Sequence, residues 1–257
     1  MLILATMALL VQGGACKAIE PLKVFRGALV IEGTIEQGDY EKLRTFLANR
    51  NAFNKIRRGV FLASPGGRVT ESIRMGYLIR ALNLRTLLPS LPAERGAGLI
   101  QANDLKHPGN YLCASACFFL YIAGIDRNPL HVGRLGIHRP FVKSRFNLPL
   151  SEKTKTAAVH SIEEVVSSYV LRMNVSEGLL TRMFAVPSNS VHWLNDDEFS
   201  KFVRWTSPQF KTDIQRQCPK EIGAEKNAEE FVACREKVAA DLAAQGWKET
   251  FDTRFEP

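Results

Sequence analysis

The chain has 257 residues, of which 46% are apolar, 23% charged and 9% aromatic, with 18 Gly and 12 Pro. This composition excludes collagen-like, coiled-coil and wholly disordered proteins, and the length suits one domain with attachments or two small domains. The net charge of +8 raises the question of a nucleic-acid partner, but the basic residues are scattered, so they indicate a solvated basic surface and no nucleic-acid partner.

The N-terminus begins with an uncharged apolar run, Met1 to Val11, followed by small residues. Eleven helical residues rise only about 16 Å, about half of a bilayer core, so the run is too short for an ordinary span. The pattern predicts a signal peptide over residues 1–18, cleaved after Ala15 or Ala18, and therefore a periplasmic or secreted protein. Two alternatives are a buried N-terminal core segment and lipidation at Cys16. Retention or lipidation of the leader would anchor the chain to a membrane, whereas its removal leaves no segment suited to a stable membrane span.

Four cysteines remain after such a cleavage: Cys113, Cys117, Cys218 and Cys234. An even number suits two disulfides in an oxidising compartment, with three possible pairings. We expect the pairing of sequence neighbours, 113 with 117 and 218 with 234. The first pair has suitable Cα spacing if a helix begins between its two members.

The first half of the chain alternates predicted strands and helices. Strands are expected at 28–31, 59–63 and 84–88. Asp39 is expected to cap the helix that follows the first strand, and Val69, Ile73 and Tyr77 mark one face of the next helix. The alternation predicts an α/β fold of right-handed βαβ units around a parallel sheet.

Further along, residues 91–110 read as a surface excursion, and residues 111–124 as a tight turn feeding a buried helix. A strand is expected at 135–138, an amphipathic helix at 151–173, a helix from the cap Ser176 to about Ala185, and a C-terminal helix at 225–245. We divide the mature chain into one α/β domain, 19–206, and a helical extension, 207–257.

Three segments carry candidate chemistry: Ser64-Pro-Gly-Gly67, Cys113-Ala-Ser-Ala-Cys117 and Gly136-Ile-His-Arg-Pro140. Taken singly, they read as a turn, a helix cap and a structural histidine. Serine acyl transfer needs a nucleophile, a base and two backbone donors for the oxyanion. Taken together, the three segments supply those parts.

The order of these motifs resembles the ClpP-type serine peptidases of the Clp/crotonase superfamily, over about residues 24–203. The resemblance implies Ser115 as the nucleophile, His138 as the general base, and the N–H groups of Gly67 and Ala116 as the oxyanion hole. It also implies a spiral of ββα units and a homo-oligomer assembled through about residues 140–173. No cofactor is expected. The chain has no P-loop and so no ATPase of its own.

The family's orienting aspartate is not matched, because its position falls near Ser190 or Val191. Asp196 and Asp197 are nearby candidate acids, although both also suit the cap or first turn of a helix. A Ser-His dyad is one consequence, and lost catalysis is another. The predicted function is a peptidase acting on peptides or unfolded proteins. The alternatives are a non-enzymatic oligomeric scaffold or peptide-binding protein, and crotonase-like acyl-thioester chemistry.

Two other uses of the cysteines are weaker hypotheses. One is a Cys-His nucleophile pair. The other is a zinc site made by Cys113, Cys117, His131 and His138, whose spacing fits known zinc motifs poorly, so no metal is predicted.

Overall fold

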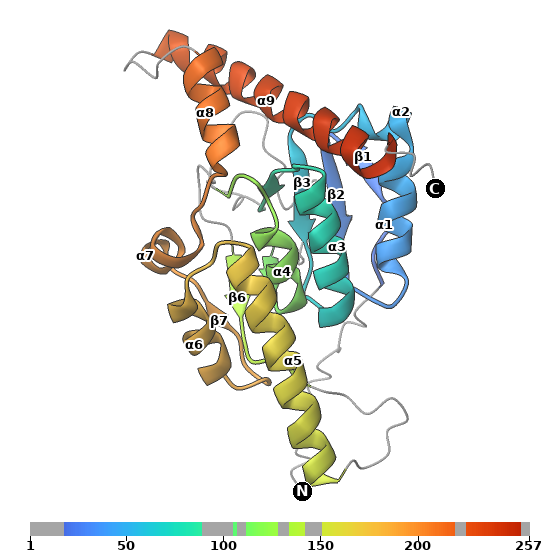
Figure 1. The fold of residues 1–257 in the computed structure, drawn as a ribbon, viewed down its shortest axis with the longest axis vertical. Coiled ribbons are helices and arrows are strands. Elements are labelled where there is room, and N and C mark those ends of the chain that lie inside the picture. Colours follow the sequence, from blue (N-terminus) through green and yellow to red (C-terminus); the bar gives the residue numbers. More distant parts are fainter. Residues whose placement is uncertain are drawn as a thin grey trace, which may run out of the picture.

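The computed structural model describes residues 18–88, 105–106, 112–127, 134–141, 151–218 and 225–252. Nearly all of the predicted leader and most of the predicted excursion at 91–110 lie outside the described residues. The described chain is a mixed α/β fold (Figure 1).

Two sheets form the centre of the molecule. The first has the order β1 (Lys23–Phe25), β2 (Ala28–Glu32), β3 (Gly59–Ala63) and β4 (Thr86–Leu87), with only the β1–β2 pair antiparallel. The second joins β5 (Leu112–Ala114) in parallel to β6 (Arg134–Ile137), which pairs antiparallel with β7 (His192–Trp193). The predicted parallel βαβ arrangement is therefore confirmed, and β1 and β7 are additions that no sequence pattern indicated.

A parallel bridge between Ser64 and Cys113 links the two sheets. The Ser64 N–H donates to the Leu112 carbonyl at 2.8 Å, and the Ala114 N–H donates to the Ser64 carbonyl at 3.0 Å. This bridge places the end of β3, where the SPGG segment begins, beside the end of β5.

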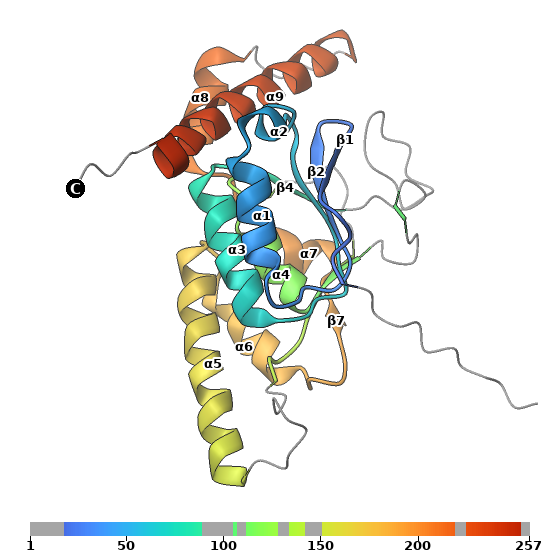
Figure 2. The same cartoon turned by 90° about the vertical axis from the view of Figure 1, so that its right-hand side faces the viewer.

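The helices lie mainly on one side of the strands, as Figure 2 shows for α1, α3, α4 and α5. Their bounds are α1 Asp39–Ala48, α2 Arg50–Phe53, α3 Val69–Ala81, α4 Ala116–Ile122, α5 Glu152–Arg172, α6 Glu177–Ala185, α7 Asp196–Glu198, α8 Pro208–Gln217 and α9 Glu225–Trp247. Apolar side chains from β2, β3, α1, α3, α4 and the second half of α5 form the main core.

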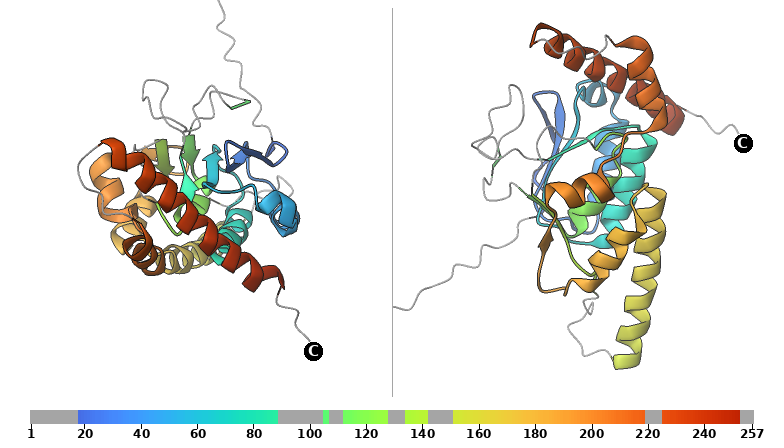
Figure 3. Two further views of the ribbon diagram at one scale, coloured as in Figure 1. Left: turned by 90° about the horizontal axis from the view of Figure 1, so that it is seen from above. Right: turned by 90° about the vertical axis from the view of Figure 1, so that its left-hand side faces the viewer.

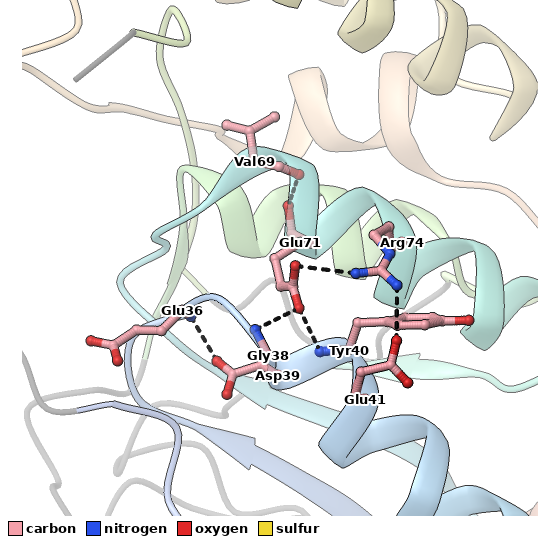
Figure 4. A network of polar contacts seen from close by, with 9 residues as sticks. Glu36, Gly38, Asp39, Tyr40, Glu41, Val69, Glu71 and Arg74 are labelled. Carbon is pink, nitrogen blue, oxygen red and sulfur yellow. Dashed lines mark hydrogen bonds and ion pairs between the residues drawn. The ribbon is translucent and has the colours of Figure 1, made fainter. Parts of the chain in front are cut away.

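The start of α1 corrects one expectation. Asp39 was expected to cap this helix, but the N-cap is Gly38, with φ 95°, and no side chain of its own caps the helix. Instead Glu71 of α3 accepts the N–H groups of Gly38 and Tyr40 at 2.9 and 3.0 Å (Figure 4). Asp39 accepts from the N–H of Glu36. A carboxylate distant in sequence therefore satisfies the free N–H groups at this helix end.

The second half of α5 is buried through Val166, Tyr169 and Val170, whereas its first half is largely exposed. Figures 1 and 2 show that first half extending beyond the rest of the folded body. Ser151 caps the helix through the N–H of Thr154, in agreement with the predicted start.

The C-terminal helices pack on the α/β body, with α9 lying across its upper end (Figure 3). Ala243 and Trp247 of α9 belong to the main core, and the Trp247 indole donates to the Leu47 carbonyl at 2.8 Å. Within the described ranges, no helix is long and apolar enough to cross a membrane.

Candidate active site

Ser115 occupies the turn between β5 and α4 and is partly exposed. Its backbone has φ 57° and ψ −123°, a conformation that residues other than glycine rarely adopt. Although Ser115 stands at the N-cap position of α4, its side chain makes no capping hydrogen bond. A cap role therefore does not account for the serine. A strained strand-to-helix turn is the geometry that exposes the nucleophile in many serine hydrolases.

A disulfide brackets this turn. Cys113 and Cys117 are bonded, with Cα atoms 5.2 Å apart, and Cys218 is bonded to Cys234, so both predicted pairings are confirmed. The bonded sulfurs of Cys113 and Cys117 are not free to act as a nucleophile or to bind zinc. Across the part of the chain that the structure describes, which leaves out His131, no cluster of three or more metal-ligating side chains occurs.

The SPGG segment presses against Ser115. Gly66 has φ 108°, and a Cβ at this position would lie 2.6 Å from Ser115 Cβ and 2.9 Å from Ala116 N. The hydroxyl of buried Ser64 accepts the Gly66 N–H at 3.1 Å. Only glycine at position 66 permits this approach, because any side chain would overlap the turn that holds Ser115.

Two backbone N–H groups at this contact have no acceptor within the described part of the chain. Ile35 N–H donates to the Gly66 carbonyl and Arg68 N–H donates to the Ile35 carbonyl, so the bridge between Ile35 and Gly67 leaves the Gly67 N–H unused. Ala116 is the first residue of α4, where a helical N–H has no partner within the helix. Neither N–H finds an acceptor among the described residues, as an oxyanion hole requires.

The polar network of Figure 4 supports the segment that holds Gly67. Glu71, which is buried, binds the N–H groups at the start of α1, and Arg74 lies 3.7 Å from its other carboxylate oxygen. Ile35 lies just before α1, and Glu71 lies in the first turn of α3. The hydrogen bonds from Glu71 to the start of α1 therefore join the same two chain segments that the Ile35–Gly67 bridge connects.

His138 follows β6 directly and is partly buried. Its Nδ1 lies 2.8 Å from the carbonyl oxygen of Arg139. A carbonyl can only accept, so Nδ1 carries the proton, and Nε2 of the neutral ring is left as the acceptor that a general base needs.

Arg139 is itself held by the end of α6. Its N–H donates to the Val186 carbonyl at 3.0 Å, and its Nε donates to the Phe184 carbonyl at 2.6 Å. The following Pro140 restricts the backbone of Arg139. The contacts with α6 and the proline that follows therefore fix the Arg139 carbonyl that orients His138. The sequence alone did not indicate this role of Arg139.

Ser115 and His138 lie on neighbouring strands, since the Ser115 N–H donates to the carbonyl of Gly136 at 3.0 Å. No hydrogen bond joins the Ser115 hydroxyl to the His138 ring in this structure. Asp196 and Asp197 are exposed in the first turn of α7, and the structure records no contact of either with His138.

The resemblance places its orienting aspartate near Ser190 or Val191, and neither residue is an acid. Ile137 pairs with His192, so the next step along the two strands sets His138 opposite Val191. A Cβ on Gly136 would lie 2.5 Å from Val191 Cγ1, which puts Val191 on the face of β6 that Gly136 and, by alternation, His138 share. Valine cannot accept a hydrogen bond, so the Arg139 carbonyl orients the ring instead.

Buried Arg127 and partly buried Arg80 bind the far end of α4. Arg80 Nε donates to the Ala123 carbonyl at 2.6 Å, and Arg127 Nη1 donates to the Ile122 carbonyl at 3.0 Å. Burial lowers the pKa of both guanidinium groups, and the charge of Arg80 lowers that of Arg127 further. Cations suit a helix C-terminus, so these contacts fix the helix that Ser115 begins.

No protein-family model matches this chain, and no curated protein matches its sequence.

Proposed function

We propose that this chain is a serine peptidase of the ClpP type that hydrolyses peptides or unfolded proteins without an ATPase of its own. The observation that carries the proposal is the geometry around Ser115. This residue has φ 57° at a strand-to-helix turn, beside the N–H groups of Gly67 and Ala116, which have no acceptor among the described residues. A serine that only capped α4 would need neither this backbone nor the glycine pair.

In the proposed reaction, Ser115 Oγ attacks the carbonyl carbon of the scissile peptide bond while His138 Nε2 takes the hydroxyl proton. The tetrahedral oxyanion accepts hydrogen bonds from Gly67 and Ala116. His138 then gives the proton to the leaving amine, which departs with the C–N bond electrons. Water, deprotonated by His138, hydrolyses the resulting ester and restores Ser115.

The neutral carbonyl of Arg139 sets the ring tautomer but stabilises an imidazolium less than a carboxylate would. The Ser115–His138 hydrogen bond, absent here, has to form when substrate binds, as catalytic contacts often do. We therefore propose a slow enzyme whose dyad is completed by its substrate.

The proposed compartment is the periplasm or the exterior of the cell. Two disulfides fit an oxidising environment, where bridges form and persist. The predicted leader over residues 1–18 belongs to the same proposal.

A fluorophosphonate probe tests the proposal directly. We expect the purified mature protein to be labelled, Ser115→Ala to abolish the labelling, and His138→Ala to slow it by at least tenfold. Ser168→Ala, at an exposed site on α5, is the matched control. Labelling that survives Ser115→Ala would refute the assignment.

A non-catalytic peptide-binding scaffold is the second candidate. The valine at position 191 and the missing Ser115–His138 hydrogen bond favour it. Peptide binding without turnover, unaffected by His138→Ala, would support this candidate over the peptidase.

Self-association through α5 is part of the proposal. The projecting helix exposes Val165 and Leu171, 47% and 51% accessible. We expect sedimentation velocity to show an oligomer that Val165→Glu with Leu171→Glu converts to smaller species, because charges would replace apolar contacts. Unchanged sedimentation would place the interface elsewhere.

A further inference from the structure

A cavity of about 670 Å³, wide open to the surface, lies between α6, β7 and the segment that joins them. It lies close to His138, since Val191 is opposite that residue and Val186 binds Arg139. The proposed mechanism does not use it.

The lining has two chemically different parts. Ala185, Val186, Pro187, Val191 and Phe202 contribute apolar surface. Arg182 contributes guanidinium donors, and His192 contributes its imidazole ring. This combination of apolar walls with a few convergent polar groups is characteristic of ligand sites, which commonly occupy about 300–1,000 Å³.

Buried Glu198 holds the Arg182 and His192 side chains in place. His192 Nε2 lies 3.0 Å from each carboxylate oxygen, and Arg182 Nη1 pairs with the same group. A capping box fixes Glu198 in turn, since Asn195 N–H donates to its carboxylate at 3.2 Å. Burial alone would raise the pKa of Glu198, but hydrogen bonds from Asn195 and His192, with the charge of Arg182, lower it, so Glu198 is ionised at neutral pH.

Part of the Arg182 guanidinium remains available. Arg182 pairs with Glu198 through Nη1, and its Nε and Nη2 contact no acceptor among the residues the structure describes. A neutral His192 ring that donates to Glu198 through Nε2 has an acceptor at Nδ1, so the donors for a ligand carboxylate come from Arg182. The Nε–Nη2 edge of a guanidinium matches the two oxygens of a carboxylate.

We infer that this cavity binds a carboxylate joined to an apolar group, and that its ligand is the C-terminal residue of a peptide ending in an apolar side chain. The Arg182 edge receives the carboxylate, and the apolar lining receives the side chain. A free fatty acid offers the same chemistry. The site does not depend on whether Ser115 is a nucleophile.

The test measures binding to the full mature chain carrying Ser115→Ala, so that turnover cannot interfere. Fluorescent peptides ending in leucine, with either a free carboxylate or an amide, are titrated by anisotropy. We expect amidation to weaken binding at least tenfold. Arg182→Ala should weaken the acid to the level of the amide, and Arg182→Lys should restore part of the difference.

Arg172→Ala, at an exposed site on α5, is the matched control and should change nothing. Ala185→Trp, which fills the cavity without removing a charge, should abolish binding of the acid. Equal binding of acid and amide, or full binding by Arg182→Ala or Ala185→Trp, would overturn the inference. Octanoate is used as a competitor: tighter binding than the peptide acid would overturn the peptide as ligand, and weaker binding supports it.

Discussion

At the scale of single residues, the candidate site depends on Ser115, whose backbone has a positive φ that serine rarely adopts. A residue in such a backbone conformation costs on the order of 1–3 kcal/mol, and it persists only where its surroundings impose it. Here Ser115 is bonded through its N–H to β6, lies between two bonded cysteines and is contacted by Gly66. The surrounding fold therefore stabilises Ser115 in this uncommon backbone conformation.

The residue opposite His138 allows a gain-of-function prediction. In Val191→Asp, the Cβ atoms of positions 191 and 138 would lie about 4.5–5.5 Å apart across the strands, so the new carboxylate can accept a hydrogen bond from His138 Nδ1 and stabilise the imidazolium. We expect kcat/KM for a peptide substrate to rise at least tenfold and the acidic limb of its pH profile to move to higher pH.

Val191→Asn supplies hydrogen bonding without charge and should give the smaller effect. If Val191→Asp left both kcat/KM and the pH profile unchanged, the orienting role assigned to this position would be wrong.

At the scale of elements, the β5–Ser115–α4 unit is fixed at both ends. The Cys113–Cys117 bridge constrains its beginning, and Arg80 with Arg127 binds the carbonyls at its end. The two disulfides therefore have different roles, because the Cys218–Cys234 bridge links the end of α8 to α9, away from this unit.

These roles can be separated by paired substitutions. We expect Cys113→Ala with Cys117→Ala to slow fluorophosphonate labelling of Ser115 about tenfold, because the turn is no longer constrained. Cys218→Ala with Cys234→Ala should leave the labelling rate unchanged. It should instead lower the unfolding free energy by about 3 kcal/mol, the chain-entropy estimate for a loop of this length. Equal labelling rates in both variants would contradict the role given to the first bridge.

At the scale of the whole molecule, buried Asp126 joins distant parts of the chain. Its carboxylate binds Arg85 before β4 at 3.0 Å, Arg235 of α9 at 2.6 Å, and the Thr206 hydroxyl at 3.0 Å. Together with Trp247 in the main core, these contacts make α9 part of the α/β body's packing.

Asp126→Asn removes the buried charge that pairs with two partly buried arginines, Arg85 and Arg235. We expect a loss of about 3–5 kcal/mol in the free energy of unfolding, the usual effect of breaking a buried ion pair. Asp241→Asn, which breaks an exposed pair with Lys237, is the control and should cost under about 1 kcal/mol. Urea unfolding followed by circular dichroism measures both, and similar midpoints would show that Asp126 does not stabilise the fold.

Much of this protein follows from patterns within short stretches of sequence. The strand at Gly59–Ala63, the helix between Ser176 and Ala185, and both disulfide pairings agree with what the sequence predicted. These features depend on residues that are close together along the chain: apolar periodicity, a capping residue beside its own helix, and neighbouring cysteines. They can therefore be predicted without knowledge of the tertiary structure.

The contacts that complete the candidate site join residues that are far apart in the sequence. Glu71 caps a helix more than thirty residues before it, the Arg139 carbonyl is held by the end of α6, and β7 brings Val191 to face His138. Each depends on chain segments that meet only after the sheets and helices have packed. Local sequence therefore determines the elements and the identity of the reactive groups, whereas tertiary packing decides their partners, because hydrogen bonds and ion pairs form between neighbours in space.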